Sequence, residues 1–70
     1  MDPLKQFALN MKALRAERGW SQEALSEHSG LHYTAISKLE RCARSPEFQT
    51  VVTLATAFDV PAGRLFEGIP

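Results

Sequence analysis

The chain has 70 residues, of which 44% are hydrophobic and 23% charged, and its eight basic and eight acidic side chains give a formal net charge of zero at pH 7. This length predicts one small folded domain over residues 1–70, and the lone cysteine, Cys42, excludes a disulfide within the chain and, with only two histidines, a zinc site of four Cys or His ligands. No apolar run could span a membrane and the first residues do not resemble a signal peptide, so the reducing cytoplasm is the expected compartment.

Charge is unevenly distributed along the chain. Residues 1–44 hold seven of the eight basic side chains and five of the eight acidic ones, whereas residues 45–70 hold one basic and three acidic side chains. The neutral total gives no support for nucleic-acid binding, because basicity of the whole domain is its usual sign. The asymmetry nevertheless indicates one part that attracts an anionic partner and one part with another purpose.

The first predicted helix starts at the N-terminus and ends at Gly19. Asp2 followed by Pro3 is typical of a helix start, and glycine is the usual residue just beyond a helix end. Apolar side chains recur at helical spacing along one stripe of this segment: Leu4, Phe7, Met11 and Leu14.

Two short helices follow. Ser21 is expected to cap a helix over residues 22–28, which the Ser29-Gly30 pair ends. After this turn, a third helix is predicted from residue 32 or 33 to about Arg41.

A fourth helix is predicted over roughly residues 47–58, with Ser45-Pro46 as its cap. The face opposite its apolar arc is polar but uncharged. Residues 59–61 are expected to end the fourth helix, and a last helical turn that contains Leu65 and Phe66 follows them. Since no segment alternates like a strand, five short helices predict a compact all-α fold. The apolar arc of the fourth helix consists of Phe48, Val51, Val52, Leu54, Ala55 and Phe58.

The third predicted helix carries the main functional signal. On a helical wheel its inward arc is apolar, its outward arc has hydroxyl groups and cations without a carboxylate, and Glu40 lies at the border of the buried arc. Such a helix fits the major groove of DNA, where cations and hydroxyls contact phosphates and base edges. An ordinary solvated helix would show the same pattern, so both interpretations stay open at this point. The outward arc consists of Tyr33, Thr34, Ser37, Lys38 and Arg41, and the inward arc of Ala35, Ile36 and Leu39.

The segment before this helix favours DNA binding. A helix of about seven residues, a turn with glycine and a second amphipathic helix form the helix-turn-helix pattern. Ala24 is small where the two helices would cross, Gly30 allows a left-handed backbone in the turn, and Ile36 fills the space between the helices. The rest of this small core is expected from Leu25, Leu31 and Leu39.

Several blocks follow one another in a specific order: RAERGWSQEAL at residues 15–25, SGLHYTAISKLER at 29–41, SPEFQT at 45–50 and LATAFDVP at 54–61, then Leu65-Phe66. Together they resemble the XRE-type helix-turn-helix family of the lambda-like phage repressors and Cro, over about residues 7–67. The resemblance implies a five-helix lambda-repressor-like fold, with the helix-turn-helix at about 21–41 and C-terminal helices for core and dimerisation at about 46–67. It also implies sequence-specific binding of double-stranded DNA, commonly by a homodimer on a palindromic operator.

The resemblance further implies DNA contacts by individual residues. Gln22 would contact a phosphate beside the first backbone amides of its helix, the outward side chains of the third helix would lie at base edges, and Arg41 and Arg44 would hold phosphates. These arginines could instead be solvated charges. His32 replaces the usual Ser, Thr or Asp cap, and since histidine is expected to cap poorly, it either reaches DNA or is a tolerated surface residue. The set expected at DNA is Ser21, Gln22, His32, Tyr33, Thr34, Ser37, Lys38, Arg41 and Arg44.

Four further positions are expected to shape the fold. By resemblance, Arg15 and Glu40 form a structural pair that links the first helix to the recognition helix and does not contact DNA. Cys42 stands where glycine usually ends the recognition helix, and a tolerated small residue is favoured there over a redox or crosslinking site. Pro61 replaces a Ser-like cap, so the fifth helix should be short or irregular.

A homodimer would place its half-sites about one helical turn, roughly 34 Å, apart. Because the second and third helices face DNA, the dimer surface is expected in the acidic C-terminal part, beside the uncharged face of the fourth helix. Alternatively, Leu65 and Phe66 only close the core, and at least one of them is expected to do so. The expected interface residues are Val60, Leu65, Phe66 and Ile69.

No other residues point to chemistry. A helix break separates His28 from His32, and Cys42 is the only further ligand, so no metal site is expected. No nucleophile has a base beside it and no glycine loop would hold a phosphate, so we expect no enzyme, no cofactor and no small-molecule effector domain. The chain is therefore expected to be a regulator like a phage repressor or a restriction–modification controller. The alternative is an antitoxin or another protein-interaction module in which DNA binding is secondary.

Overall fold

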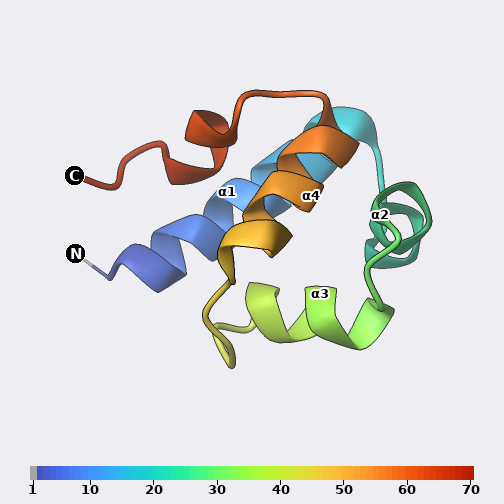
Figure 1. Ribbon diagram of the computed structural model, residues 1–70, viewed down its shortest axis with the longest axis horizontal. Coiled ribbons are helices and arrows are strands. Elements are labelled where there is room, and N and C mark those ends of the chain that lie inside the picture. Colours follow the sequence, from blue (N-terminus) through green and yellow to red (C-terminus); the bar gives the residue numbers. More distant parts are fainter. Residues whose placement is uncertain (1) are drawn as a thin grey trace.

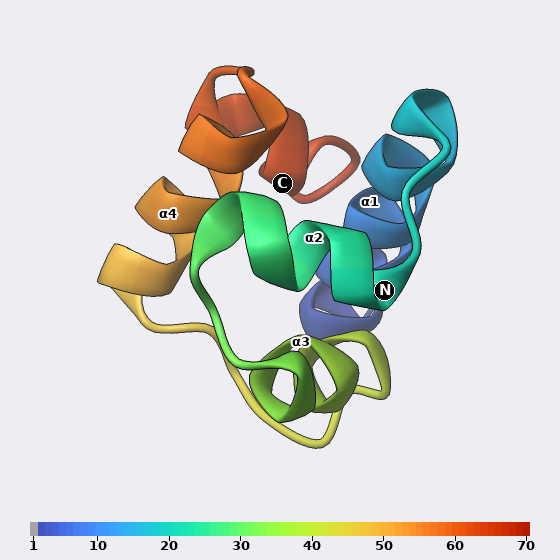
Figure 2. The ribbon, with the colours of Figure 1, turned by 90° about the vertical axis from the view of Figure 1, so that its right-hand side faces the viewer.

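The computed structural model describes residues 2–70, which form helices and turns without a strand. The α-helices are α1 (Pro3–Arg18), α2 (Gln22–Ser29), α3 (Tyr33–Glu40) and α4 (Phe48–Phe58), and the 3-10 helix η1 (Ala62–Phe66) follows. In Figure 1, α3 lies along the lower edge and η1 at the upper edge. α2 packs between α3 and α4, α1 contacts α3, and η1 contacts both α1 and α4 (Figure 2). The predicted all-α fold is confirmed, and its fifth helix is the short 3-10 turn. None of the helices in this part of the chain combines the length and apolar character of a membrane span.

The ends of α1 and α2 follow their sequence signals. The Asp2 carboxylate accepts hydrogen bonds from two backbone N–H groups in the first turn of α1, and the Ser21 hydroxyl accepts one in α2. Gly19 and Gly30 end the two helices in the left-handed conformation, with φ of 67° and 78°. α2 includes Ser29, one residue more than predicted, because the glycine alone makes the turn.

Two later helix ends differ from the prediction. α3 ends at Glu40, one residue earlier than expected. The Ser45-Pro46 cap predicted for α4 is wrong, because these residues lie in the non-helical segment that leads to the helix. Glu47 takes the cap position with an extended backbone and without a capping hydrogen bond from its side chain. The irregular fifth helix that Pro61 predicted is present, since η1 follows this proline directly.

α3 ends on a cysteine in a conformation that normally selects glycine. Cys42 has a φ of 60°, in the left-handed region. The N–H group of Ala43 donates back to the carbonyl of Lys38 at 2.9 Å, which is the bond that defines a Schellman helix end. Asp59 closes α4 in the same way, with a φ of 57°. The predicted turn therefore forms with full glycine-like geometry although no glycine is present.

One apolar core joins all five helical elements. The helix-turn-helix part contributes Leu25, Ile36 and Leu39, as expected, while Leu31 packs against the core and stays partly exposed. α2 and α3 have eight residues each, which is too short for stability in isolation, so this shared core is what keeps them helical. The buried side chains of this core cluster are Phe7, Met11, Leu14, Leu25, Ile36, Leu39, Val51, Leu54, Ala55, Phe58 and Leu65.

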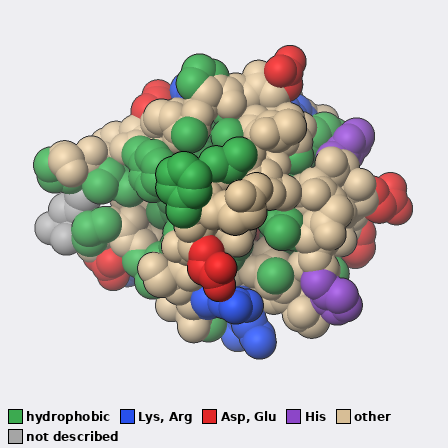
Figure 3. All heavy atoms as spheres, in the orientation of Figure 1, with side chains coloured by type: hydrophobic (Ala, Val, Ile, Leu, Met, Phe, Trp, Pro, Cys, Tyr) green, Lys and Arg blue, Asp and Glu red, His purple; other side chains and the backbone are tan. Residues whose placement is uncertain are grey.

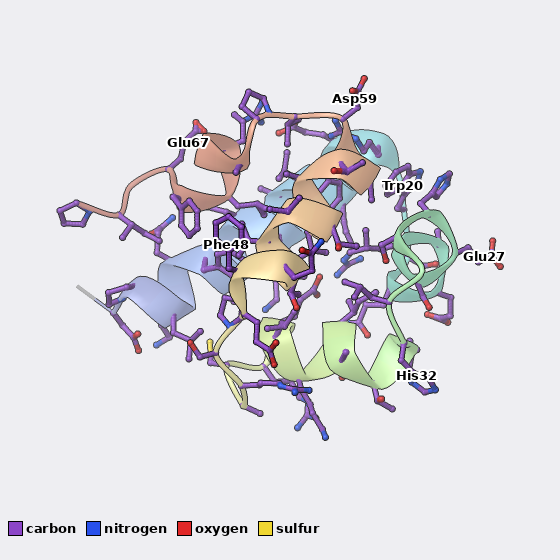
Figure 4. The ribbon with its side chains drawn as sticks, viewed as in Figure 1. Trp20, Glu27, His32, Phe48, Asp59 and Glu67 are labelled. Carbon is purple, nitrogen blue, oxygen red and sulfur yellow. The ribbon has the colours of Figure 1, made fainter. Side chains whose placement is uncertain are left out.

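An apolar groove of about 640 Å³ lies between the N-terminal part of α1, the start of α4 and the C-terminal segment. Phe48 belongs to the apolar arc predicted for the fourth helix, yet its side chain is 83% exposed. Phe48 is the first residue of α4 and lies beyond the edge of the core, against the groove (Figure 4). Figure 3 shows hydrophobic side chains gathered on this face. The groove is lined mainly by apolar side chains, among them Leu4, Phe7, Phe48, Val52, Phe66 and Ile69.

Candidate nucleic-acid interface

α3 lies along one edge of the molecule (Figure 1). The side chains of its polar arc are exposed or half-buried, so this arc faces solvent. Buried Ile36 and Leu39 fix the opposite arc of the helix in the core. Consequently the hydroxyl and cationic side chains that the sequence placed on one arc do share one accessible surface. We call this surface the α3 polar face; it consists of Tyr33, Thr34, Ser37, Lys38 and Arg41, of which Ser37 is half-buried and the others exposed.

The only carboxylate of α3, that of Glu40, is withdrawn from this surface. Its side chain is 2% exposed, and the Arg15 guanidinium donates to both carboxylate oxygens at 2.7 Å. The hydrogen bond to Glu40 raises the pKa of Arg15, and the attraction of Glu40 and Glu23 acts in the same direction, against the effect of burial. Arg15 also donates to the backbone carbonyl of Trp20 at 2.9 Å. This pair attaches α3 to α1 and leaves the α3 polar face without a negative charge from its own helix.

Gln22 and Ser21 lie at the start of α2, where the sequence placed phosphate contacts. The Gln22 side-chain amide donates to Glu40 Oε1 at 3.1 Å, a link between α2 and α3 that sequence reasoning missed. An amide nitrogen has two hydrogens, so one remains for a second acceptor. The Ser21 hydroxyl is exposed and serves as the α2 cap.

His32 caps α3, so the expectation that this histidine caps poorly is wrong. Its Nδ1 atom accepts the Thr34 backbone N–H group at 3.2 Å and lies 2.8 Å from the Thr34 hydroxyl oxygen. The imidazole can take this role because its unprotonated nitrogen is an acceptor, like a Ser or Asp oxygen. In Figure 4 the ring projects outward from the end of α3 that adjoins α2.

The cations at the C-terminal end of α3 have only weak partners. Arg41 Nε donates to Ser37 Oγ at 3.4 Å, and Arg44 is 3.9 Å from a Glu47 carboxylate oxygen, with both side chains exposed. Within residues 2–70, Lys38 has no ion-pair partner. Exposed pairs of this kind contribute about 0–1 kcal/mol, so these cations are available to a polyanion at little cost.

The dimer surface expected from the sequence is partly wrong. Leu65 is fully buried, because η1 turns this side chain into the core, and it cannot contact a partner. Val60 and Ile69 are partly buried against the core, whereas Phe66 is exposed. Phe48, which the sequence placed on the apolar arc of the fourth helix, is the most exposed large hydrophobic side chain among residues 2–70.

An aromatic stack that the sequence did not reveal holds α2 against α4. The Trp20 ring stacks on His28, with centroids 4.0 Å apart, and on Phe58, with centroids 5.8 Å apart. The Arg18 guanidinium lies over the Phe58 ring and donates to its backbone carbonyl. No group of three or more His, Cys, Asp or Glu side chains among residues 2–70 is placed to hold a metal ion.

Comparison with known proteins gives a family match that covers most of the chain. Residues 11–65 match the helix-turn-helix family HTH_3. Control protein C.SmaI of Serratia marcescens is 37% identical over 65 residues, which cover 93% of this chain and 77% of C.SmaI. The HTH-type transcriptional regulator SutR of Escherichia coli (strain K12) is 36% identical over 62 residues, which cover 87% of this chain but only 35% of SutR.

Solved structures give the same result. The restriction–modification controller protein C.AhdI of Aeromonas hydrophila superposes with a TM-score of 0.86 and 35% identity, over 90% of this chain and 96% of C.AhdI. The controller protein C.Esp1396I, solved as a tetramer in complex with its natural 35-base-pair operator, has a TM-score of 0.85 and 28% identity, over 96% of this chain and 88% of that one. The chain therefore belongs to the XRE-type helix-turn-helix family of transcriptional regulators.

Proposed function

We propose that this chain regulates transcription by binding double-stranded DNA in a sequence-specific manner, with α3 in the major groove. The observation that carries the proposal is the α3 polar face: all its outward groups can contact phosphates or base edges, and the one carboxylate of the helix is buried against Arg15. The major groove, about 12 Å wide, admits a helix in this orientation.

The positions of the side chains favour a division of roles. Lys38 lies within the α3 polar face without an ion-pair partner in the described chain, so we assign it, with Tyr33, Thr34 and Ser37, to base edges. The remaining candidates lie at the ends of the helix pair, where phosphates flank an inserted helix, and we assign them to backbone contacts. These are Ser21, Gln22, His32, Arg41 and Arg44.

The relatives support a controller-like regulator in particular. C.SmaI is named a control protein, C.AhdI and C.Esp1396I are restriction–modification controllers, and C.Esp1396I was solved on its operator. We therefore infer an operator made of two half-sites, each bound by one copy of the chain.

The apolar groove supports a homodimer. Among residues 2–70, three of the five exposed large hydrophobic side chains, Phe48, Val52 and Phe66, line this one groove. A two-fold interface uses the same patch on both copies, so the patch must contain both a protrusion and a hollow that receives it. Phe48 is the protrusion and the groove beside it is the hollow, which makes this face self-complementary. In the dimer that we propose, each Phe48 side chain enters the groove of the other copy.

The decisive experiment is affinity selection of random duplex DNA by the purified protein at about 0.15 M salt, close to physiological ionic strength. Enrichment of an inverted repeat with half-sites about one turn apart, roughly 34 Å, is the expected outcome. A folded protein that enriches no sequence would contradict the proposal and favour the protein-interaction module, for which a partner pull-down is the next step.

Two protein variants, each tested for binding to the selected operator, separate base contacts from phosphate contacts. Lys38→Ala should relax the preference at one position of each half-site and lower affinity by about 1–3 kcal/mol. Arg44→Ala should weaken all sequences alike and reduce the slope of log affinity against log salt by about 1 per half-site. Both effects are read from titrations of operator and scrambled DNA at several salt concentrations.

Arg64→Ala is the matched control, because it also removes one cation, but from η1. This guanidinium is paired with Glu17 and Glu67, and η1 lies on the edge of the molecule opposite α3 (Figure 1). Its salt slope should equal that of the wild type. Equal losses in Arg44→Ala and Arg64→Ala would mean that only total charge matters and would place DNA elsewhere than on α3.

A further inference from the structure

The cap of α3 fixes where the proton of the His32 ring lies. A backbone N–H group is always a donor, so His32 Nδ1, which is 3.2 Å from the Thr34 nitrogen, accepts this hydrogen and carries none itself. A neutral imidazole has a proton on one nitrogen only. The His32 proton is therefore on Nε2, on the other side of the ring.

His32 Nδ1 also fixes the direction in which the Thr34 hydroxyl hydrogen points. Thr34 Oγ1 lies 2.8 Å from His32 Nδ1, a normal hydrogen-bond distance. Because Nδ1 has no proton to donate, the Thr34 hydroxyl must donate to it. The hydroxyl hydrogen is thus used inside the protein, and the lone pairs of Oγ1 remain for an outside partner. Thr34 is exposed on the α3 polar face, so these lone pairs are accessible to DNA.

We infer that Thr34 is a specificity-determining residue that offers DNA a hydrogen-bond acceptor and no donor, and therefore recognises a base with an amino group in the major groove. Adenine N6 and cytosine N4 are the two such groups. Guanine and thymine present only acceptors there, which would face the Thr34 lone pairs without a hydrogen between them. An unrestrained hydroxyl would rotate and accept either kind of base. His32 removes that freedom and is the positioning residue. This inference rests on the proposed DNA-binding function.

The tautomer is tested first, in the free protein. A long-range proton–nitrogen NMR spectrum distinguishes the two ring nitrogens by their chemical shifts, and the expected result is a protonated Nε2 and an unprotonated Nδ1 for His32. A proton on Nδ1 would reverse the hydrogen bond to Thr34 Oγ1 and overturn the inference. The spectrum of His32→Asn identifies the signals by their absence.

The base preference is tested by affinity selection with four variants. The wild type is expected to select adenine or cytosine at one position of each half-site, on the strand that faces Thr34. Thr34→Val keeps the branched shape but removes the oxygen, and should lose this preference with an affinity loss of about fivefold, the value of one neutral hydrogen bond. Thr34→Ser keeps the hydroxyl and should keep the preference.

Variants at position 32 separate the positioning role from the helix cap. His32→Ala frees the Thr34 hydroxyl, so guanine and thymine should become acceptable at the same position, with adenine and cytosine still bound. His32→Asn supplies an amide oxygen that can accept both Thr34 groups and should restore the wild-type preference. Thermal melting of each variant verifies that it is folded at the temperature of the selection.

The possible outcomes separate this inference from the function on which it rests. An operator that is enriched but requires guanine or thymine at the Thr34-dependent position overturns the inference alone. The same holds for an operator that Thr34→Val selects unchanged, or for a preference that His32→Ala leaves intact. If the wild type enriches no DNA at all, the proposed function fails and the inference fails with it.

Discussion

Cys42 and His32, at the two ends of α3, each occupy a position that another residue type normally fills. Cys42 adopts the left-handed conformation usual for glycine, and His32 supplies the acceptor usual for a serine or aspartate. The sequence predicted both helix ends to within one residue, but not how His32 and Cys42 would satisfy the backbone there. Helix signals report where the chain turns, whereas the choice of φ and of the acceptor atom depends on backbone geometry that residue type alone does not determine.

At this scale, Cys42→Gly is expected to stabilise the protein. A non-glycine residue in the left-handed region costs about 1–2 kcal/mol, and glycine avoids most of this cost although it adds freedom to the unfolded chain. We expect a gain of about 1 kcal/mol in the free energy of unfolding, measured by urea titration in reducing buffer. Cys42→Ala is the control: it removes the thiol but keeps Cβ, and should give no gain. An equal gain in both variants would mean that the thiol, and not the backbone, is responsible.

The orientation of α3 depends on contacts with other elements, because a helix of eight residues is not stable in isolation. Arg15 attaches it to α1, and Gln22 attaches it to the start of α2. The sequence predicted that these helices exist, and family resemblance supplied the Arg15–Glu40 pair. The Gln22–Glu40 bond joins residues 18 apart, and its formation depends on rotamers of two long side chains. Local patterns contain no information about that contact.

Glu40→Gln tests this junction. It keeps the shape of the side chain but leaves the partly buried Arg15 guanidinium without its counter-charge, which should lower the free energy of unfolding by about 3 kcal/mol. Gln22→Ala should cost only about 1 kcal/mol, because Glu40 keeps both bonds from Arg15. Urea unfolding followed by circular dichroism measures both values. A loss below about 0.5 kcal/mol for Glu40→Gln, as for an exposed pair, would contradict the anchoring role.

Across the whole molecule, the α3 polar face and the apolar groove are separate surfaces built on different helices. Periodicity and caps were sufficient to predict the all-α fold, because both are local. Which apolar side chains remain exposed was not predictable in the same way. Phe48 is exposed and Leu65 is buried, since burial at the ends of α4 and η1 depends on whether another element covers these side chains. The core of the fold was therefore easier to predict than its candidate interface.

Phe48→Asp should convert the proposed dimer into a monomer with an unchanged fold. The side chain is 83% exposed in the single chain, so its replacement removes little from the core, but a carboxylate would be buried without a partner in the groove of the other copy. Sedimentation velocity measures the mass of the species, and circular dichroism verifies the helix content.

Leu9→Asp is the matched control, because Leu9 is also an exposed apolar residue but does not line the groove. It should leave the dimer intact. A dimer that survives Phe48→Asp would place the interface elsewhere, and a wild-type protein that is monomeric at all concentrations would refute self-association through the groove.

The Arg15–Glu40 pair has a fixed direction: the positive and the negative side chain cannot change places, which a count of charges does not reveal. Arg15 uses a further donor on the Trp20 carbonyl, while Glu40 uses a further lone pair on the Gln22 amide. If the two charges were exchanged, a carboxylate would replace the donor at the Trp20 carbonyl, and acceptor would face acceptor. An isolated ion pair would tolerate an exchange of its two charges, whereas the contact between α1, α2 and α3 at Arg15 and Glu40 would not. The evolutionary route that remains open is simultaneous replacement of both partners by apolar side chains, which leaves no buried charge behind.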